Sequence, residues 1–223
     1  MTNRLLNKDE AIPEVFYIFV NQLNPTTEHN FRVIGQFCSA AFLSIDDQDF
    51  LKKYIQGSIR YLPYEPCRMD QLAVSPFFMT AINDYRIEYD AEVFREKHAN
   101  LIPSRLSALY AFGDYESCKL VSEKYHWPLN SVERFRLKPH PLNRVAKVNM
   151  EHISLARLAY RTASLEDVES VWQSYWSGDA NCSFNLPAPG FSRRTYESGT
   201  IWEYLIEGTV EHLDRNQNVA PNT

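Results

Sequence analysis

An alternating pattern near the end of the chain, over Thr200–Glu211, constrains the fold most. Apolar residues recur at its even positions and glutamates at its odd positions: Trp202, Tyr204, Ile206 and Val210 against Glu203, Glu207 and Glu211. Successive side chains of a strand point to opposite faces, so this pattern predicts a strand with one apolar and one carboxylate face. Two plainer interpretations stay open, an exposed strand face without a chemical role and a helix with glutamates four residues apart.

The rest of the chain mixes helical and strand patterns without a regular βαβ alternation, which favours an α+β fold. Further strands are expected at 15–20, 106–112 and 144–151, and the last strand region extends over 200–213. Helices are expected at 31–54 (or two short helices broken near 44–47), 81–98, 115–125 and 165–176, with Asp114 and Ser164 as N-caps. Proline-rich stretches predict loops at 61–76 and 181–198.

Composition excludes several classes of protein. Seven glycines in 223 residues are spread too thinly for a glycine-rich phosphate loop, and neither HExxH nor GxSxG occurs. The four cysteines lie far apart without a CxxC pair, so we expect no metal site. No apolar run approaches a membrane span and the first 14 residues contain no signal-peptide core, so we expect a cytoplasmic protein without a membrane partner.

Charge is unevenly distributed although the net charge is only −5. The segment from Arg134 to Arg161 holds seven basic residues against one acid, whereas 195–214 holds five acids and no Lys or Arg. Solvated faces are one interpretation of both segments. A basic surface for a polyanion beside an acidic catalytic edge is the other.

Three segments together resemble the motifs of the ADP-ribosyltransferase superfamily. The glutamate strand around Glu203 is similar to its third motif, the stretch from Ser107 through Tyr110 into the 115–125 helix resembles its second, and the strand 16–19 stands where the first belongs. A closer likeness is to an uncharacterised bacterial branch, through Pro103-Ser104-Arg105 and Tyr175-Trp176-Ser177-Gly178. The order and spacing of these motifs, which frame most of the chain, carry the resemblance.

The resemblance implies an ADP-ribosyltransferase-like split β-sheet surrounded by helices, as one domain over 1–223 with a helical insertion around 30–100. It implies a glycosyltransferase that uses NAD as substrate and modifies nucleic acid or protein, as a bacterial toxin or phage-defence effector with a possible antitoxin protein partner. Glu203 would be catalytic, because a placed carboxylate stabilises the positive charge that develops on the ribose. The NAD-binding residues would be Tyr17, Ser104, Arg105, Ser107 and Tyr110.

Two features depart from this expectation. The usual His or Arg of the first motif is absent from 15–21, and Arg105 or Arg32 would have to replace it. Strand alternation also sends Ser107 and Tyr110 to opposite faces unless the strand bends or ends between them. The alternatives to a transferase are an NAD glycohydrolase and a non-catalytic binding module with the same fold.

Overall fold

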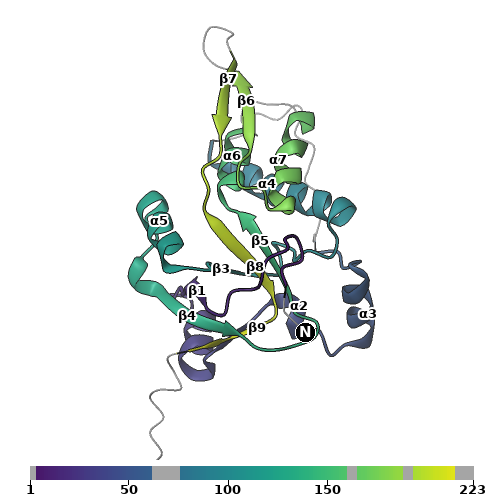
Figure 1. Cartoon of the computed structure of the whole chain (residues 1–223), viewed down its shortest axis with the longest axis vertical. Coiled ribbons are helices and arrows are strands. Elements are labelled where there is room, and N and C mark those ends of the chain that lie inside the picture. Colours follow the sequence, from purple (N-terminus) through teal and green to yellow (C-terminus); the bar gives the residue numbers. More distant parts are fainter. Residues whose placement is uncertain (1–3, 62–75, 160–164, 188–192, 214–223) are drawn as a thin grey trace, which may run out of the picture.

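The computed structural model describes residues 4–61, 76–159, 165–187 and 193–213, which form a mixed helix and sheet structure (Figure 1). One antiparallel sheet has the strand order β1-β4-β9-β2, and a second has the order β3-β8-β5. The four-stranded sheet is formed by β1 (Phe16–Phe19), β4 (Val132–Leu137), β9 (Thr209–His212) and β2 (Gln36–Cys38). The three-stranded sheet is formed by β3 (Leu109–Ala111), β8 (Trp202–Glu207) and β5 (Arg144–Asn149). This architecture confirms the α+β class.

The two sheets are joined at two points. The backbones of Tyr17 and Phe112 exchange two hydrogen bonds of 2.8 Å, which ties β1 to the end of β3. The chain also passes directly from β8 to β9 at Gly208, where a Cβ atom would lie 2.8 Å from Asn143 Oδ1 and 3.0 Å from Leu137 Cδ1. The single strand region expected over 200–213 is therefore two strands, because glycine allows the close approach at which the chain changes sheets.

Two even-numbered side chains of β8, Tyr204 and Ile206, lie in the core between the sheets. Tyr204 and Ile206 pack there with Phe16, Phe135 and Val210, and the rings of Phe16 and Tyr204 meet edge to face at 5.6 Å. The odd-numbered side chains point to the opposite face, as the alternation predicted. Glu203 and Glu207 are therefore on the helix-covered face of the three-stranded sheet.

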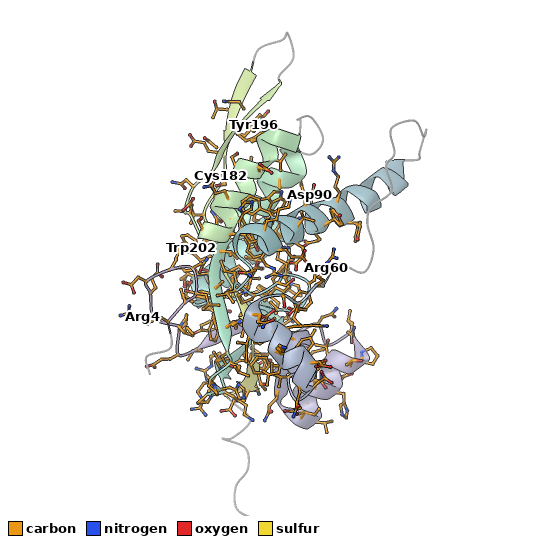
Figure 2. All side chains as sticks on the ribbon, turned by 90° about the vertical axis from the view of Figure 1, so that its right-hand side faces the viewer. Arg4, Arg60, Asp90, Cys182, Tyr196 and Trp202 are labelled. Atoms are coloured by element: carbon orange, nitrogen blue, oxygen red, sulfur yellow. The ribbon has the colours of Figure 1, made fainter. Side chains whose placement is uncertain are left out.

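Three helices cover that face: α4 (Pro76–His98), α6 (Glu151–Ala159) and α7 (Leu165–Ser177). Leu205 of β8 and Val148 of β5 are buried against Ile87, Trp172 and Tyr175 of these helices. Side chains fill the space between α4 and the strands behind it (Figure 2). The sheet thus separates two apolar clusters, and the carboxylates of β8 lie at the boundary of the helical one.

The shorter helices lie around the sheets: α1 (Pro25–His29), the π-helix η1 (Asn30–Ile34), α2 (Ala40–Leu43), α3 (Gln48–Gln56), α5 (Tyr115–Tyr125) and the 3-10 turn η2 (Leu129–Ser131). The expected cap of α5 is confirmed, since the Asp114 carboxylate accepts a hydrogen bond of 2.6 Å from Ser117 N. The other expected cap, Ser164, and nearly all of the expected 61–76 loop lie outside the described residues. No helix in the described part of the chain is both long and apolar enough to cross a bilayer.

Several sequence-based expectations were wrong. The hairpin of β6 (Ser183–Pro187) and β7 (Arg193–Glu197) occupies most of the expected 181–198 loop, where prolines mark the end of the strand and not the absence of one. Strand β2 lies inside the expected 31–54 helical region and pairs with β9, whereas the alternative of two short helices broken near 44–47 is confirmed by α2 and α3. Strand β4 and helix α6 were not predicted. Pairing partners distant in sequence stabilise such short elements, which local propensity does not reveal.

Candidate functional site

A cavity of about 570 Å³ lies where β1, β3 and β8 adjoin α6. The three adjacent strands contribute Phe19, Tyr110 and Glu203 to its wall. Its further lining residues are Arg105, Phe112, Tyr125, Trp127, Met150, Ile153, Ser154 and Arg157. The volume is within the range of sites for small ligands, roughly 300–1,000 Å³.

Glu203 is almost completely buried at this cavity, with 6 % of its side chain exposed. In the described part of the chain its carboxylate accepts no hydrogen bond, and the nearest cationic group is Arg105 Nη1 at 3.9 Å. Burial raises the pKa of Glu203 to about 7, against an opposing effect of the Arg105 charge and a smaller raising effect of Glu88. A buried carboxylate with unused lone pairs can accept a hydrogen bond from a ligand hydroxyl.

Arg105 is held in place by groups other than Glu203. Its guanidinium donates two hydrogen bonds of 2.8 Å to Glu88 and one of 2.7 Å to the Tyr175 hydroxyl. It also lies over the rings of Tyr110 and Tyr175, at 5.4 Å and 5.5 Å from their centroids. Although burial opposes the charge, the neighbouring tyrosines and Glu88 raise the pKa of Arg105 well above its usual value. The cation is therefore permanent and rigidly oriented.

Two motifs from the sequence meet at this arginine. Arg105 belongs to the Pro-Ser-Arg segment and Tyr175 to the Tyr-Trp-x-Gly segment, 70 residues apart in the chain, and their side chains are hydrogen-bonded. Glu88 completes the group from α4 and was not anticipated, since its position among many helical acids carries no distinguishing signal. Tyr125, Trp127, Ser154 and Arg157, which also line the cavity, were likewise missed.

The hydroxyl of Tyr110 is hydrogen-bonded to the protein, whereas the residue is partly exposed to solvent. Its hydroxyl donates a hydrogen bond of 2.6 Å to Arg105 O, and burial raises the pKa of Tyr110 above its usual value. The residue as a whole remains 36 % exposed. The ring is thus anchored at its polar end and remains accessible for stacking on a flat ligand.

Aromatic rings form a second wall of the cavity. Phe19 packs edge to face on Phe112 at 5.9 Å and on Trp127 at 5.2 Å, and Trp127 is 40 % exposed. This wall offers flat apolar surface at the opening. A ligand that combines a planar ring with polar groups would suit this combination of walls.

Ser104 and Ser107 are not part of the cavity lining. Both are buried around Glu207. Its Oε1 accepts hydrogen bonds from Ser107 Oγ at 2.6 Å, Ser104 N at 3.2 Å and the Tyr61 hydroxyl at 3.2 Å. Strand β3 begins only at Leu109, so the two serines precede it and the alternation of the strand does not apply to them. The opposite placement of Ser107 and Tyr110 that alternation predicted is not found, because the strand ends between them: Tyr110 pairs with Leu205 and so shares the sheet face of Glu207, to which Ser107 is bonded.

A buried ion pair extends this polar group. Arg95 donates hydrogen bonds of 2.9 Å and 2.6 Å to the Glu92 carboxylate, which also accepts one of 2.8 Å from Ser104 Oγ. The remaining Arg95 donors bond the carbonyls of Asn100 and Ile102. All these charges are paired and hydrogen-bonded, as buried charges must be. The group fixes the chain on both sides of Arg105 and so positions its guanidinium.

Tyr17 and Arg32, the two remaining candidates, lie elsewhere. Tyr17 is half-buried on β1 with its ring 6.0 Å from that of Tyr115, outside the cavity lining. Arg32 pairs with Glu28 and Gln22 at the surface. Of the sequence-predicted site residues, the structure brings Arg105, Tyr110 and Glu203 together; an NAD-binding role for Tyr17, Ser104 and Ser107 stays a prediction.

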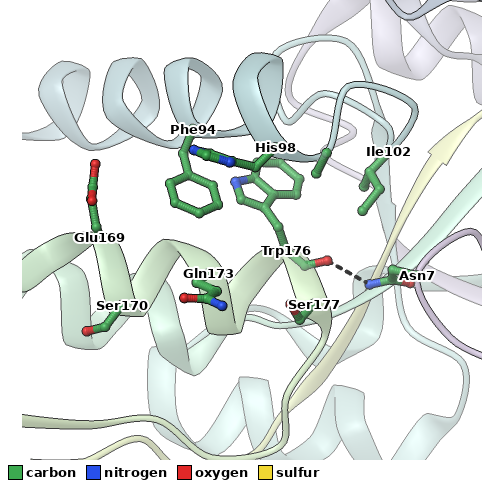
Figure 3. Close-up of a pocket in the computed structure, with 10 residues that line it drawn as sticks. Asn7, Phe94, His98, Ile102, Glu169, Ser170, Gln173, Trp176 and Ser177 are labelled. Atoms are coloured by element: carbon green, nitrogen blue, oxygen red, sulfur yellow. Dashed lines mark hydrogen bonds between the residues drawn. The ribbon is translucent and has the colours of Figure 1, made fainter.

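A larger hollow of about 840 Å³ lies between α4 and α7 (Figure 3). Phe94 and His98 of α4 stand opposite Glu169 and Gln173 of α7, and Trp176 lies between them. The titratable residues of this hollow, His98 and Glu169, are exposed. It therefore lacks the buried carboxylate and the oriented cation that distinguish the cavity at Glu203.

Three basic residues of the segment from Arg134 to Arg161 form ion pairs with acids elsewhere in the chain. Arg136 pairs with Glu211, Lys147 with Glu10 and Arg157 with Asp84, on different elements of the fold. Among the described residues no group of three or more His, Cys, Asp or Glu is arranged to hold a metal ion. No protein-family model matches the chain, and a search of curated proteins finds no similar sequence.

Proposed function

We propose that the chain is an NAD-dependent ADP-ribosyltransferase with an ADP-ribosyltransferase-like split sheet, and that Glu203 is its catalytic residue. The observation that carries the proposal is the common cavity of β1, β3 and β8. These are the three strands to which the sequence resemblance assigns the motifs, and each contributes a side chain to one wall. The resemblance was drawn from the order of short motifs, so their convergence in space is an independent argument.

The chemistry of the lining supports the same reaction. Cleavage of the bond between nicotinamide and ribose develops positive charge on the sugar, which the ionised Glu203 stabilises in a water-poor site. Arg105 keeps a positive charge 3.9 Å away, which favours the ionised form of Glu203 without occupying its lone pairs. The open ring of Tyr110 offers a stacking surface for nicotinamide.

The acceptor is a macromolecule, nucleic acid or protein, in a toxin or phage-defence setting with a possible antitoxin. This part of the proposal rests on the resemblance. Arg136, Lys147 and Arg157 are each paired with an acid, so these three basic residues do not favour nucleic acid over protein.

The test is incubation with NAD labelled on the adenylate phosphate, in the presence of separate protein and nucleic-acid fractions. The proposal expects label on one of these fractions with the wild type and with Glu211→Gln, and none with Glu203→Gln. Free labelled ADP-ribose alone would identify an NAD glycohydrolase instead. Unchanged NAD in every reaction would point to a binding module and contradict the proposal.

A further inference from the structure

The two arginines that line the cavity, Arg105 and Arg157, differ in how strongly other protein groups already bind their guanidinium groups. Arg105 is 10 % exposed at its side chain, and three of its five N–H donors are used by Glu88 and Tyr175. Among the described residues, Arg157 on α6 has one ion pair, with Nε 3.4 Å from Asp84 Oδ1, and both partners are more than half exposed. An exposed pair of this kind contributes little stability and exchanges easily. Arg157 is therefore the cavity-lining cation that can transfer to a ligand.

Ser154 lies one turn before Arg157 on the same face of α6 and presents a different polar group. The Tyr125 hydroxyl donates to the buried carboxylate of Glu151 at 2.6 Å, so it cannot also donate to Ser154. The 2.7 Å contact between Ser154 Oγ and Tyr125 must then be donated by the serine. Ser154 is left with acceptor lone pairs toward the cavity.

This wall of α6 thus combines one available cation with one acceptor. An anionic group is the partner for Arg157, and a hydroxyl or amide is the partner for Ser154. Glu203 lines the same cavity from β8 and repels anions, so a ligand that carries both a phosphate and a sugar has one favourable orientation. Its phosphate lies toward α6 and its sugar toward β8.

We propose that Arg157 binds a phosphate of the nucleotide ligand in this cavity, and that Arg105, which is held by Glu88 and Tyr175, contacts no phosphate. The inference rests on the proposed function and extends it by assigning the phosphate subsite to α6. The sequence is too poor in glycine for a glycine-rich phosphate-binding loop, and the inference assigns phosphate binding to Arg157 instead.

Calorimetric titration with a series of ligands tests the assignment. The series is NAD, nicotinamide mononucleotide, nicotinamide riboside (which has no phosphate) and ADP. Arg157→Gln should weaken the binding of NAD, the mononucleotide and ADP by roughly 10- to 100-fold, the usual effect of losing a hydrogen bond to a charged group. Binding of the riboside should not change. The matched control is Arg136→Gln, a surface arginine on β4 outside the cavity lining, which should bind all four ligands as the wild type does.

Asp84→Asn should change the affinity for NAD in the opposite direction to Arg157→Gln. Removing the carboxylate that competes for Arg157 should strengthen the binding of NAD by about two- to fivefold and leave the riboside unchanged. Because the variant gains affinity, misfolding cannot imitate the expected result. Unchanged NAD binding in Asp84→Asn would contradict the exchange of partners at Arg157.

The outcomes separate this inference from the proposed function. Phosphate-dependent loss in Arg157→Gln together with uncleaved NAD would retain the subsite and overturn the transferase. NAD cleavage with equal affinity of wild type and Arg157→Gln would retain the transferase and overturn the subsite. Absence of any nucleotide binding by the wild type would overturn both.

Discussion

The guanidinium of Arg105 lies 3.9 Å from the carboxylate of Glu203, which is beyond hydrogen-bond distance. The same guanidinium donates two hydrogen bonds of 2.8 Å to Glu88. Arg105 therefore influences Glu203 through its field and not through a bond. The carboxylate remains oriented toward the cavity with its lone pairs available. Arg105 thus favours the ionised form of Glu203 and leaves the carboxylate oxygens free to contact a ligand.

Glu203→Gln should lower the turnover of NAD by on the order of 100-fold while leaving the dissociation constant of NAD within about twofold. The amide is nearly isosteric but carries no negative charge where positive charge develops. Steady-state kinetics and calorimetric titration measure the two quantities. Glu211→Gln is the control, because Glu211 is on β9 and pairs with Arg136. Glu207 is unsuitable as a control, since it accepts hydrogen bonds from both serines. Comparable losses in Glu203→Gln and Glu211→Gln would remove Glu203 from the chemistry.

The same substitution should stabilise the folded chain at alkaline pH. The pKa of Glu203 is about 7 when folded against 4.5 for an ordinary glutamate, so the folded state binds more protons between these values. Stability from this group is full below about pH 4.5 and is lost as pH rises to about 7. Urea denaturation at pH 8 should find Glu203→Gln more stable than the wild type by on the order of 1–3 kcal/mol, with the gap closing at pH 5. If Glu203→Gln were less stable than the wild type at pH 8, the negative charge of Glu203 would not destabilise the folded state.

Arg105→Gln should move the pH dependence of NAD turnover to higher pH. Loss of the cation raises the pKa of Glu203 further, so a larger fraction of the carboxyl is protonated at pH 7. Glu88 would be left without its partner, and the double variant Arg105→Gln, Glu88→Gln removes that complication. We expect both to recover part of their activity above pH 8. If turnover fell equally at every pH and kept the wild-type midpoint near pH 7, Arg105 would not act through Glu203.

Tyr110→Ala should weaken the binding of NAD by roughly tenfold, the usual loss when a stacking ring is removed. Tyr110→Phe is the matched control, because it keeps the ring and removes only the hydrogen bond to Arg105 O. Calorimetry with nicotinamide mononucleotide reports the same contact. Equal affinities of Tyr110→Ala and Tyr110→Phe would place the ligand ring elsewhere.

Ser107→Ala separates a supporting role from an NAD-binding one. The hydroxyl donates to Glu207 inside the protein, so its removal should lower the free energy of unfolding by about 1–3 kcal/mol. NAD affinity should stay at the wild-type value in the folded fraction. A weaker affinity with unchanged stability would restore Ser107 to the ligand site.

Much of the local structure follows from the sequence alone. The alternation over 200–207 places Glu203 on the face opposite Tyr204 in any fold that makes this segment a strand, because the period of two is a property of the backbone. Asp114 caps α5 for an equally local reason, since its carboxylate reaches an N–H three residues later.

The site itself required the tertiary structure. Glu88 and Tyr175 lie 17 and 70 residues from the arginine that they hold, and no local pattern relates them. Ser107 and Arg105 are two positions apart, yet Ser107 donates a hydrogen bond to Glu207 in the interior and Arg105 lies 3.9 Å from Glu203 at the cavity. The sequence by itself determined which face of a strand carries the carboxylate. Only the packing of α4, α6 and α7 on the three-stranded sheet decided which distant groups meet it, because burial and long-range pairing set the charge of Glu203 and the contacts of Arg105.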